Sequence, residues 1–596
     1  MRMTETRFRM LEVDLTSEKT RTVDVTEEVR LHLGARGLAS KIFWDRMPEG
    51  ADPLGPDNML HVGVGPVTAL IGDKTIFSFK SPLFGWKGRA AMSGYFGREL
   101  VNSPFNGGIL VTGAAERPVY LYVHDDDVQI RDASKYWGEY KQRSEYALRE
   151  ELREETGEEF AVAVIGPAGE NAVRYANITH EWFHSASKWG GGGVMGSKRL
   201  KAIAVRGTQG PDYADHGKVW EIFQHYFTHP AVKAHNYRER RFGHMTSMPS
   251  LYYAGGEGVK NNNLGWHEVC ERSNAFKHEL EFYLRTEGCP GCANPCFVPF
   301  YNPTKPYGPV AGEFRHDNTG CFNANILMGY KEMSYITTLL DELGMDGEET
   351  GGIVAWAMEL YERGIITKEE LGGIDLKWGS VEATDRLLRK IAYREDLGDV
   401  LADGYKYAIP AIGKGCEEYA WQVHWCSCAT YDMRRMPDHA VSYATSHNGA
   451  RMGTGLRAQL TESATVCNFT ASPVGRVWGS LNEGVRQYLN AVCGWDLTLE
   501  DVDEIALRNY MLERCYCLRE GYRPEIHTKI PDRAFDQPLV NKHGETFVLD
   551  REEFARMVRD YNVNVLQLTE DGLPRRDLLK ELDLGYVLPT LDRLDL

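Results

Sequence analysis

Three cysteines stand close together near the middle of the chain, and their spacing restricts what this segment can do. Cys289, Cys292 and Cys296 form a C-x2-C-x3-C array within EGCPGCANPC. The Pro and Gly residues between them bend the backbone, so the three thiolates can converge on one object. A cubane [4Fe-4S] cluster takes four cysteine thiolates, so the array predicts an iron-sulfur site with a fourth ligand elsewhere.

Zinc and plain buried thiols are the alternatives to a cluster. Zinc also accepts four sulfurs, but structural zinc sites usually show two paired knuckles, and no second C-x2-C follows. We therefore favour the cluster. Spacing does not select the fourth ligand, because nine cysteines remain: Cys270, Cys321, Cys416, Cys426, Cys428, Cys467, Cys493, Cys515 and Cys517.

Composition and charge narrow the class of protein and its location. The 12 cysteines are interpreted as ligands or free thiols, because the chain start lacks the apolar core of a signal peptide and we expect a reducing cytoplasm. No stretch approaches the length of a membrane span, so none is expected. The net charge of -17, without a block of Lys or Arg, argues against nucleic acid as a partner.

The chain has 596 residues, too many for a single core, and its patterns divide it into domains. Short β-rich runs such as VYLYVHDDDVQI predict a β-sheet domain over residues 1–208. Helical periods such as YKEMSYITTLLDELG dominate afterwards. We place one helical domain at 209–420 and a second at 421–596, the latter boundary mainly on the resemblance described next. The expected fold class is α+β.

Several motifs occur in an order that is specific to one family. They are KSPLFG from Lys80, SGYFGREL, GGGGVMGSKRLKAIAVRG, the cysteine array, DELGMD, YDMRRMP, LNAVCGWDLT and DGLPRRDLLKELDLG. Along nearly its whole length the chain resembles the tungsten-containing aldehyde:ferredoxin oxidoreductases. The resemblance implies an N-terminal β-sheet domain that forms a base for a tungsten (or molybdenum) bis-pyranopterin, followed by two mostly α-helical domains.

The resemblance also implies which segments hold the pterins. One is DELGMD, with Asp341, Gly344 and Asp346; the other is ESATVC, where Glu462 replaces the usual Asp and Cys467 becomes the fourth cluster ligand. Reduced pterins present N–H donors, which carboxylates accept. Asp432, with Arg434 beside it in YDMRRMP, is a further acceptor. Without the family context, D-x-x-G-x-D is also the pattern of a helix C-terminus with a glycine cap.

Phosphate contacts are implied at two further places. The glycines Gly190, Gly191 and Gly192 would let the backbone approach the pterin phosphates and a bridging Mg²⁺, although a flexible loop has the same composition. Lys74 and Lys188 stand where the family tends to have Arg. We expect both to contact phosphate or pterin as point charges.

The chain departs from the family at its acid/base pair. GEFRHDNTG has Arg315 where a Glu is expected, and SHNGARMG has Met452 at the position of a His. The candidate catalytic replacements are Glu313, His316 and His447, with Arg315 and Arg451 as anchors for an anionic substrate. Cys321 and the pair Cys426 and Cys428 are candidates to approach the metal.

The resemblance implies an enzyme that interconverts an aldehyde and a carboxylic acid. Electrons would pass through the [4Fe-4S] cluster to ferredoxin or a small iron-sulfur subunit, and we expect a homodimer or a hetero-oligomer. Two alternatives remain open. One is the catalytic subunit of a reductase acting on an aromatic or other anionic acid derivative, as in the benzoyl-CoA reductases. The other is a metal-stapled redox scaffold without catalysis.

Overall fold

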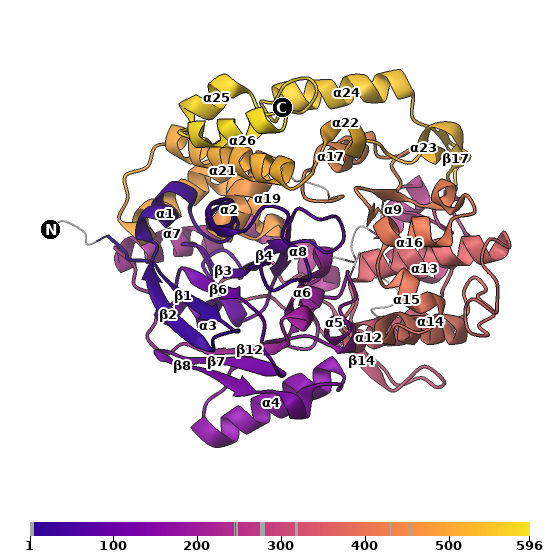
Figure 1. The fold of residues 1–596 in the computed structure, drawn as a ribbon, viewed down its shortest axis with the longest axis horizontal. Helices are drawn as coiled ribbons and strands as arrows, with labels where there is room; N and C mark the ends of the chain where they lie inside the picture. Colours follow the sequence, from indigo (N-terminus) through magenta and orange to yellow (C-terminus); the bar gives the residue numbers. More distant parts are fainter. Residues whose placement is uncertain are drawn as a thin grey trace.

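The computed structural model describes residues 5–243, 245, 248–273, 281–315, 320–428, 431–451 and 455–596. Two six-stranded sheets occupy its N-terminal part (Figure 1). The first has the order β2-β1-β6-β3-β4-β5, with bounds β1 Arg9–Asp14, β2 Lys19–Asp24, β3 Leu60–Gly63, β4 Thr75–Lys80, β5 Lys87–Met92 and β6 Gly108–Thr112. The second has the order β11-β10-β9-β12-β7-β8, with bounds β7 Val119–His124, β8 Asp127–Asp132, β9 Ala161–Val164, β10 Ile178–His180, β11 His184–Ala186 and β12 Leu200–Arg206.

Six α-helices accompany these sheets in the described residues up to Arg206: α1 Thr26–His32, α2 Ala35–Arg46, α3 Phe96–Val101, α4 Lys141–Thr156, α5 Pro167–Glu170 and α6 Gly191–Ser197. The inner strand β4, TIFSFK, is buried along its whole length, as expected for a β-branched and aromatic run covered on both faces. It pairs antiparallel with β5, with Thr75 opposite Met92. Lys74 and Ser93 therefore meet just beyond the end of this pair, where the candidate site lies.

The remainder of the chain is mostly helical, which confirms the predicted α+β class. Its helices include α7 His216–Thr228, α8 Pro230–Phe242, α9 Met248–Ala254, α12 Tyr330–Leu343, α13 Gly347–Glu362, α14 Val381–Tyr393, α15 Leu397–Leu401, α16 Tyr405–Ile412, α17 Pro437–Thr445, α18 Leu456–Ala464, α19 Asn468–Trp478, α20 Leu481–Cys493, α21 Leu499–Arg519, α22 Pro524–His527, α23 Arg533–Asp536, α24 Arg551–Asn564, α25 Arg576–Glu581 and α26 Leu588–Arg593. Among the residues described after Arg206, three hairpins of short strands lie between them: β13 Pro299–Asn302 with β14 Val310–Glu313, β15 Gln422–Val423 with β16 Cys426–Ser427, and β17 Leu539–Val540 with β18 Thr546–Phe547.

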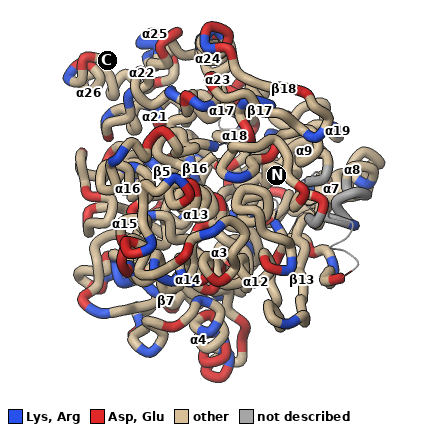
Figure 2. Tube along the Cα trace, turned by 90° about the vertical axis from the view of Figure 1, so that its right-hand side faces the viewer, with Lys and Arg blue, Asp and Glu red and all other residues tan. Residues whose placement is uncertain are grey.

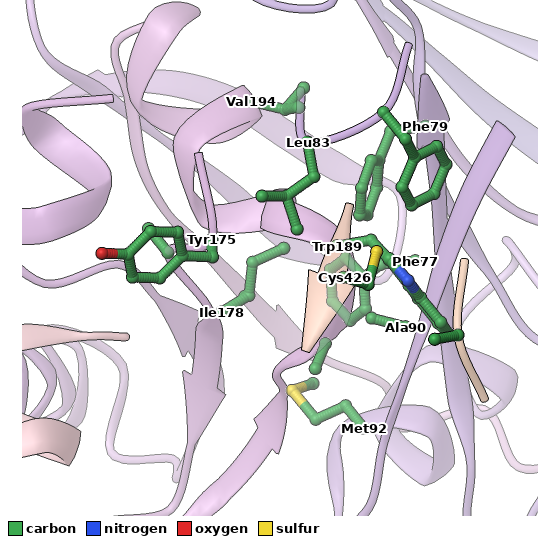
Figure 3. Close-up of a cluster of buried hydrophobic side chains, with 14 of the residues drawn as sticks. Phe77, Phe79, Leu83, Ala90, Met92, Tyr175, Ile178, Trp189, Val194 and Cys426 are labelled. Atoms are coloured by element: carbon green, nitrogen blue, oxygen red, sulfur yellow. The ribbon is translucent and has the colours of Figure 1, made fainter. Parts of the chain in front are cut away.

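One large hydrophobic core joins both sheets to the later helices, and a smaller separate cluster lies between the second sheet and α4. Figure 3 shows Phe77 and Ala90 from the first sheet beside Trp189, with Cys426 of the later hairpin packed against the same indole. Trp189 is only 1% exposed. Segments more than two hundred residues apart therefore form a common wall, and the candidate site lies where they join.

Charged residues of both signs are interspersed along the side of the molecule drawn in Figure 2. Within the described part of the chain, no helix is both long and apolar enough to cross a membrane.

Candidate active site

A cavity of about 570 Å³ opens where the sheets, the cysteine loop and the helices α12, α13, α18 and α19 meet. Most of the residues singled out in the sequence line it. They are Lys74, Lys188, Cys289, Cys292, Cys296, Glu313, Arg315, Asp341, Asp346, Arg451, Glu462 and Cys467. These residues come from both the sheet region and the helical region, so the tertiary structure alone brings them together.

All four predicted cluster cysteines border this cavity. Cys467 directly precedes α19, and the loop of Cys289 to Cys296 is fastened to residues 69–72 by a hydrogen bond from the Gly72 amide to the Gly291 carbonyl, 3.1 Å long. Gly291 has a φ of +64° and lies so close to this segment that a Cβ would be 2.0 Å from the Ala69 carbonyl oxygen. A Cβ on Gly72 would be 3.2 Å from Cys467 Cβ and 3.9 Å from Cys292 Sγ. Cys467 and Cys292 therefore face the same glycine.

Burial makes two of these thiols harder to ionise than a free cysteine. Burial raises the pKa of Cys289 to about 11, and burial together with the neighbouring Cys467 and Cys289 thiolates raises the pKa of Cys292. Within the described residues no three His, Cys, Asp or Glu side chains are grouped to hold a single metal ion. Four cysteines around one cavity, of which Cys296 and Cys467 are buried and Cys289 and Cys292 half-buried, fit the donor set of an iron-sulfur cluster, whose positive irons would stabilise the thiolates.

The D-x-x-G-x-D segment spans the junction between α12 and α13. Gly344 caps α12 with a φ of +79°, and Asp346 begins α13 by accepting a hydrogen bond from the Glu349 amide at 2.6 Å. The glycine-cap interpretation is therefore correct as local structure, and Asp341 and Asp346 nevertheless both border the cavity. Burial raises the pKa of Asp341 to about 6.

Two lysines lie on the cavity wall near these carboxylates. Lys188 Nζ is 2.5 Å from Glu348 Oε2 and 3.9 Å from Asp346 Oδ1, so its charge is already compensated. Lys74 Nζ is 2.5 Å from Ser93 Oγ. Lys74 and Cys289 both line the cavity, and the charge of Lys74 lowers the pKa of that thiol against the effect of burial. Lys74 is thus on the cysteine side of the cavity and Lys188 on the α13 side.

Glu462 is the carboxylate that replaces the usual Asp, and it is held from behind. Its Oε2 lies 2.9 Å from Arg36 Nη1 and 2.6 Å from Arg89 Nε. Burial raises its pKa, but Arg89, Arg36 and Arg451 outweigh burial and keep the pKa below its ordinary value. Oε1 is buried and has no hydrogen-bond partner among the described residues. An ionised, unpartnered acceptor beside the cavity fits an N–H donor of a reduced pterin.

Glu313 is the last residue of β14, Arg315 stands two residues further on, and the two side chains bind each other. Arg315 Nε donates to Glu313 Oε2 at 2.5 Å, and Arg315 Nη2 donates to the Phe183 carbonyl at 2.6 Å. Burial raises the pKa of Glu313 to about 7, although Arg315 opposes the shift. A carboxyl group with a pKa near neutrality can take up or release a proton in turnover. Arg315, by contrast, already has the Glu313 carboxyl group as its side-chain partner.

His447 and Arg451 lie on the same loop, but only Arg451 lines the cavity. His447 is not part of the cavity lining; its Nε2 lies 3.0 Å from Glu513 Oε1, and burial lowers its pKa to about 4. Arg451 does line the cavity, with its guanidinium 5.7 Å from the centre of the Trp189 ring. In the part of the chain that the structure describes, Arg451 has no ion pair. His316 and Met452 lie outside the described residues.

Two other predicted groups have structural partners and do not line the cavity. A Cβ on Gly190 would be 2.0 Å from the Arg174 carbonyl oxygen, and one on Gly192 would be 2.2 Å from the Asn177 carbonyl oxygen. Gly190, Gly191 and Gly192 are buried, so this stretch is a close backbone contact and not a flexible loop. Asp432 binds Arg434, with Oδ2 2.5 Å from Nη2.

The three cysteines that were candidates to approach the metal lie outside the cavity lining. Cys321, Cys426 and Cys428 are at most 2% exposed and are absent from the cavity lining. Sequence reasoning missed Asn177, Asn294 and Arg457, which do line it. Asn177 Oδ1 and Asn294 Oδ1 are buried acceptors without a hydrogen-bond partner among the described residues. No spacing pattern marked any of the three in the sequence.

Comparisons with known proteins agree in pointing to one family. A family model described as the aldehyde ferredoxin oxidoreductase N-terminal domain matches residues 10–207. A second, described as domains 2 and 3 of the same enzyme, matches residues 219–459 and 453–584.

Individual relatives match over almost the full chain. A tungsten-containing aldehyde ferredoxin oxidoreductase of Pyrococcus abyssi is 31% identical over 97% of this chain and 98% of its own length. An aliphatic sulfonate oxidoreductase, WOR-like subunit, of Pyrococcus furiosus is 32% identical over 97% of each chain. Among solved structures, the BamBC active site complex of benzoyl coenzyme A reductase covers 99% of this chain and 100% of its own, with a TM-score of 0.77 and 22% identity.

Proposed function

Because the chain belongs to the aldehyde ferredoxin oxidoreductase family and is an oxidoreductase, we propose that it interconverts an aldehyde and a carboxylic acid at a tungsten bis-pyranopterin. Electrons pass through a [4Fe-4S] cluster to ferredoxin or a small iron-sulfur protein. Oxidation of an aldehyde takes one oxygen atom from water and releases two electrons and two protons, so the site needs both an electron exit and a proton acceptor.

One observation carries the proposal: the four cysteines and the three carboxylates of the two pterin segments border one cavity. In the sequence the array at Cys289 and the ligand Cys467 are far apart, as are Asp341 and Glu462. A cluster held by the thiols and a pterin held by the carboxylates would therefore be neighbours, as electron transfer between them requires.

Each binding role falls to a specific part of the wall. Cys289, Cys292, Cys296 and Cys467 would hold the cluster. Asp341, Asp346 and Glu462 would accept hydrogen bonds from pterin N–H groups, and Glu462 Oε1 is available for this contact.

Lys74 and Lys188 would contact pterin or phosphate groups, with Mg²⁺ as the further counter-charge. When bound, the metal centre supplies the two-electron redox chemistry that the protein side chains lack.

The protein supplies proton transfer and orientation. Glu313 is the proposed general acid/base, because it borders the cavity and its raised pKa lets it exchange a proton near neutrality. Arg315 is a positioning residue, since its two hydrogen bonds fix the Glu313 carboxylate to the Phe183 carbonyl. The buried wall excludes bulk water from the proton that Glu313 carries.

Arg451 favours a substrate with an anionic group. It lines the cavity with its guanidinium 5.7 Å from the centre of the Trp189 ring, and it has no ion pair in the described part of the chain. A guanidinium binds carboxylate, sulfonate or phosphate through paired hydrogen bonds. The named activity of the aliphatic sulfonate oxidoreductase relative is compatible with this second candidate, an aldehyde that carries an acidic group.

Analysis of the purified protein tests the proposal. We expect tungsten or molybdenum at about one atom per chain, iron at about four, and two pterins, together with aldehyde-dependent reduction of ferredoxin. Zinc in place of both metals would support the scaffold alternative. Reduction of an aromatic acid derivative without aldehyde oxidation would support the reductase alternative. Either result contradicts the proposed activity.

A further inference from the structure

A buried charged network stands directly behind Glu462, and none of the roles assigned above uses it. Its members are Arg36 on α2, Lys87 on β5, and Glu513 on α21, and their side chains are completely buried. We propose that this network, the Arg36–Glu513 support, positions Glu462 for the pterin. The inference rests on the proposed function, since it concerns the carboxylate assigned to the pterin.

Arg36 shares its guanidinium among two carboxylates and the side chain of Asn448, whose Oδ1 accepts from Nη2 at 2.5 Å. Nη1 donates to Glu462 Oε2 at 2.9 Å, whereas Nη2 donates to Glu513 Oε1 at 2.5 Å and Nε to Glu513 Oε2 at 3.1 Å. The bidentate contact to Glu513 fixes the plane of the guanidinium. The single contact to Glu462 then fixes Oε2 and leaves Oε1 unused, which is the atom without a partner in the described residues.

Glu513 is itself held by several donors, so it cannot turn away from Arg36. Lys87 Nζ donates to Glu513 Oε2 at 2.5 Å and to Ser40 Oγ at 2.6 Å. His447 Nε2 lies 3.0 Å from Glu513 Oε1. Although burial raises the pKa of Glu513, Arg36 and Lys87 hold it well below its usual range. Glu513 is therefore an anion that anchors two cations behind the cavity wall.

The charge balance explains why Glu462 depends on Glu513. Arg36, Lys87 and Arg89 carry three positive charges, and Glu462 and Glu513 carry two negative charges. Without the Glu513 charge, Arg36 and Lys87 would both be attracted to Glu462, the other buried anion of the group. Glu462 Oε1 would then bind one of these cations and would no longer be available to a ligand in the cavity. The four elements α2, β5, α18 and α21 meet here, so the support also joins the sheet region to the helices.

The test is Glu513→Gln in the cofactor-loaded protein, with pterin and metal release as the readout. The amide keeps the shape but removes the charge, so we expect pterin and tungsten to be lost about tenfold faster on dilution, within the range found for residues that orient metal-site ligands. Iron should stay at the wild-type level, because the cluster cysteines are untouched. Released pterin is measured by the fluorescence of its oxidised form, and both metals are measured by elemental analysis.

Glu520→Gln is the matched control. Glu520 follows α21, is buried, and binds Lys80 with Oε2 2.6 Å from Nζ, but it does not line the cavity. We expect both variants to lower the unfolding temperature and only Glu513→Gln to change pterin release. If Glu513→Gln fails to fold, Glu513→Asp is the second variant. Its carboxylate is one methylene further from Arg36 and Lys87, so pterin release should again be faster than in the wild type.

The outcomes separate this inference from the proposed function. Equal pterin release in wild type, Glu513→Gln and Glu513→Asp overturns the Arg36–Glu513 support alone. Equal acceleration in Glu520→Gln also overturns it, because the effect would then be general destabilisation. A wild-type protein without pterin or a group-six metal overturns the proposed function and the support together.

Discussion

Glu313 Oε2 lies 2.5 Å from Arg315 Nε on the wall of the cavity. The pair stands where the family is expected to carry its own acidic group, so the charge missing at position 315 is present two residues earlier. Arg315, which the sequence suggested as an anchor for substrate, lines the cavity and binds the proposed acid/base. The proposed acid/base and the arginine that lowers its pKa therefore lie within three residues at the end of β14.

Replacement of Glu313 by Gln should lower kcat by about 10²- to 10⁴-fold, because the amide cannot accept a proton from the reacting group. KM for the aldehyde should change little. Steady-state reduction of ferredoxin measures both constants. Glu382→Gln, in an exposed carboxylate of α14, is the control and should behave as wild type. Full kcat in Glu313→Gln would remove Glu313 from the mechanism.

The pH dependence of kcat/KM should report the same carboxyl group. Because its pKa is raised to about 7, activity that needs the Glu313 carboxylate should rise with pH through this value. Arg315 lowers the pKa of Glu313, so Arg315→Gln should move the midpoint to higher pH. This rise of kcat/KM with pH should be absent in Glu313→Gln. A midpoint unchanged in Arg315→Gln would show that another group titrates.

Cys292→Ser should bleach the visible absorption of the cluster and stop electron transfer to ferredoxin, while part of the tungsten stays bound. Serine removes one of four thiolates from the iron-sulfur site. Absorption spectra and iron analysis provide the measurement. Cys270→Ser, a buried cysteine away from the cavity lining, is the control and should keep the spectrum. Survival of both absorbance and turnover in Cys292→Ser contradicts the ligand assignment.

Arg451→Gln should raise KM for aldehydes that carry a carboxylate or sulfonate by roughly tenfold or more, the cost of losing a charge-assisted hydrogen bond. Neutral aldehydes should keep their KM. Kinetics with a matched pair of charged and neutral substrates give the comparison, and Arg559→Gln on the exposed face of α24 serves as control. An equal change for both substrates would indicate that Arg451 contacts the cofactor and not the anionic group.

Gly192→Ala should destabilise the protein by about 1–3 kcal/mol, because the added methyl group would lie 2.2 Å from the Asn177 carbonyl oxygen. Thermal unfolding measures the loss. Gly585→Ala is the control, since a Cβ there meets no atom within 4 Å. A neutral effect at Gly192 would show that this glycine is free of the close contact and is available for a ligand.

The fold class and the cysteine array could be predicted because both depend on patterns among residues that are close together in the sequence. Short β-rich runs predicted the N-terminal sheets, and helical periods predicted α12, α13 and α14. The pterin segments came from motifs whose order matches the family. At Asp341 and Gly344 the same motif predicted either a glycine cap or a pterin segment. The structure has the cap at Gly344, and the turn there leaves the neighbouring carboxylates beside the cavity.

The sequence by itself determined the α+β architecture, the three-cysteine loop and the family, because spacing and periodicity are properties of neighbouring residues. Only the tertiary structure decided how the charges are paired. Asp432 is paired with Arg434, Arg315 with Glu313, and Glu462 with Arg36, which is 426 residues away in the chain. The energy of a buried charge depends on the partners and the exclusion of water around it, and both are set only when distant segments pack together.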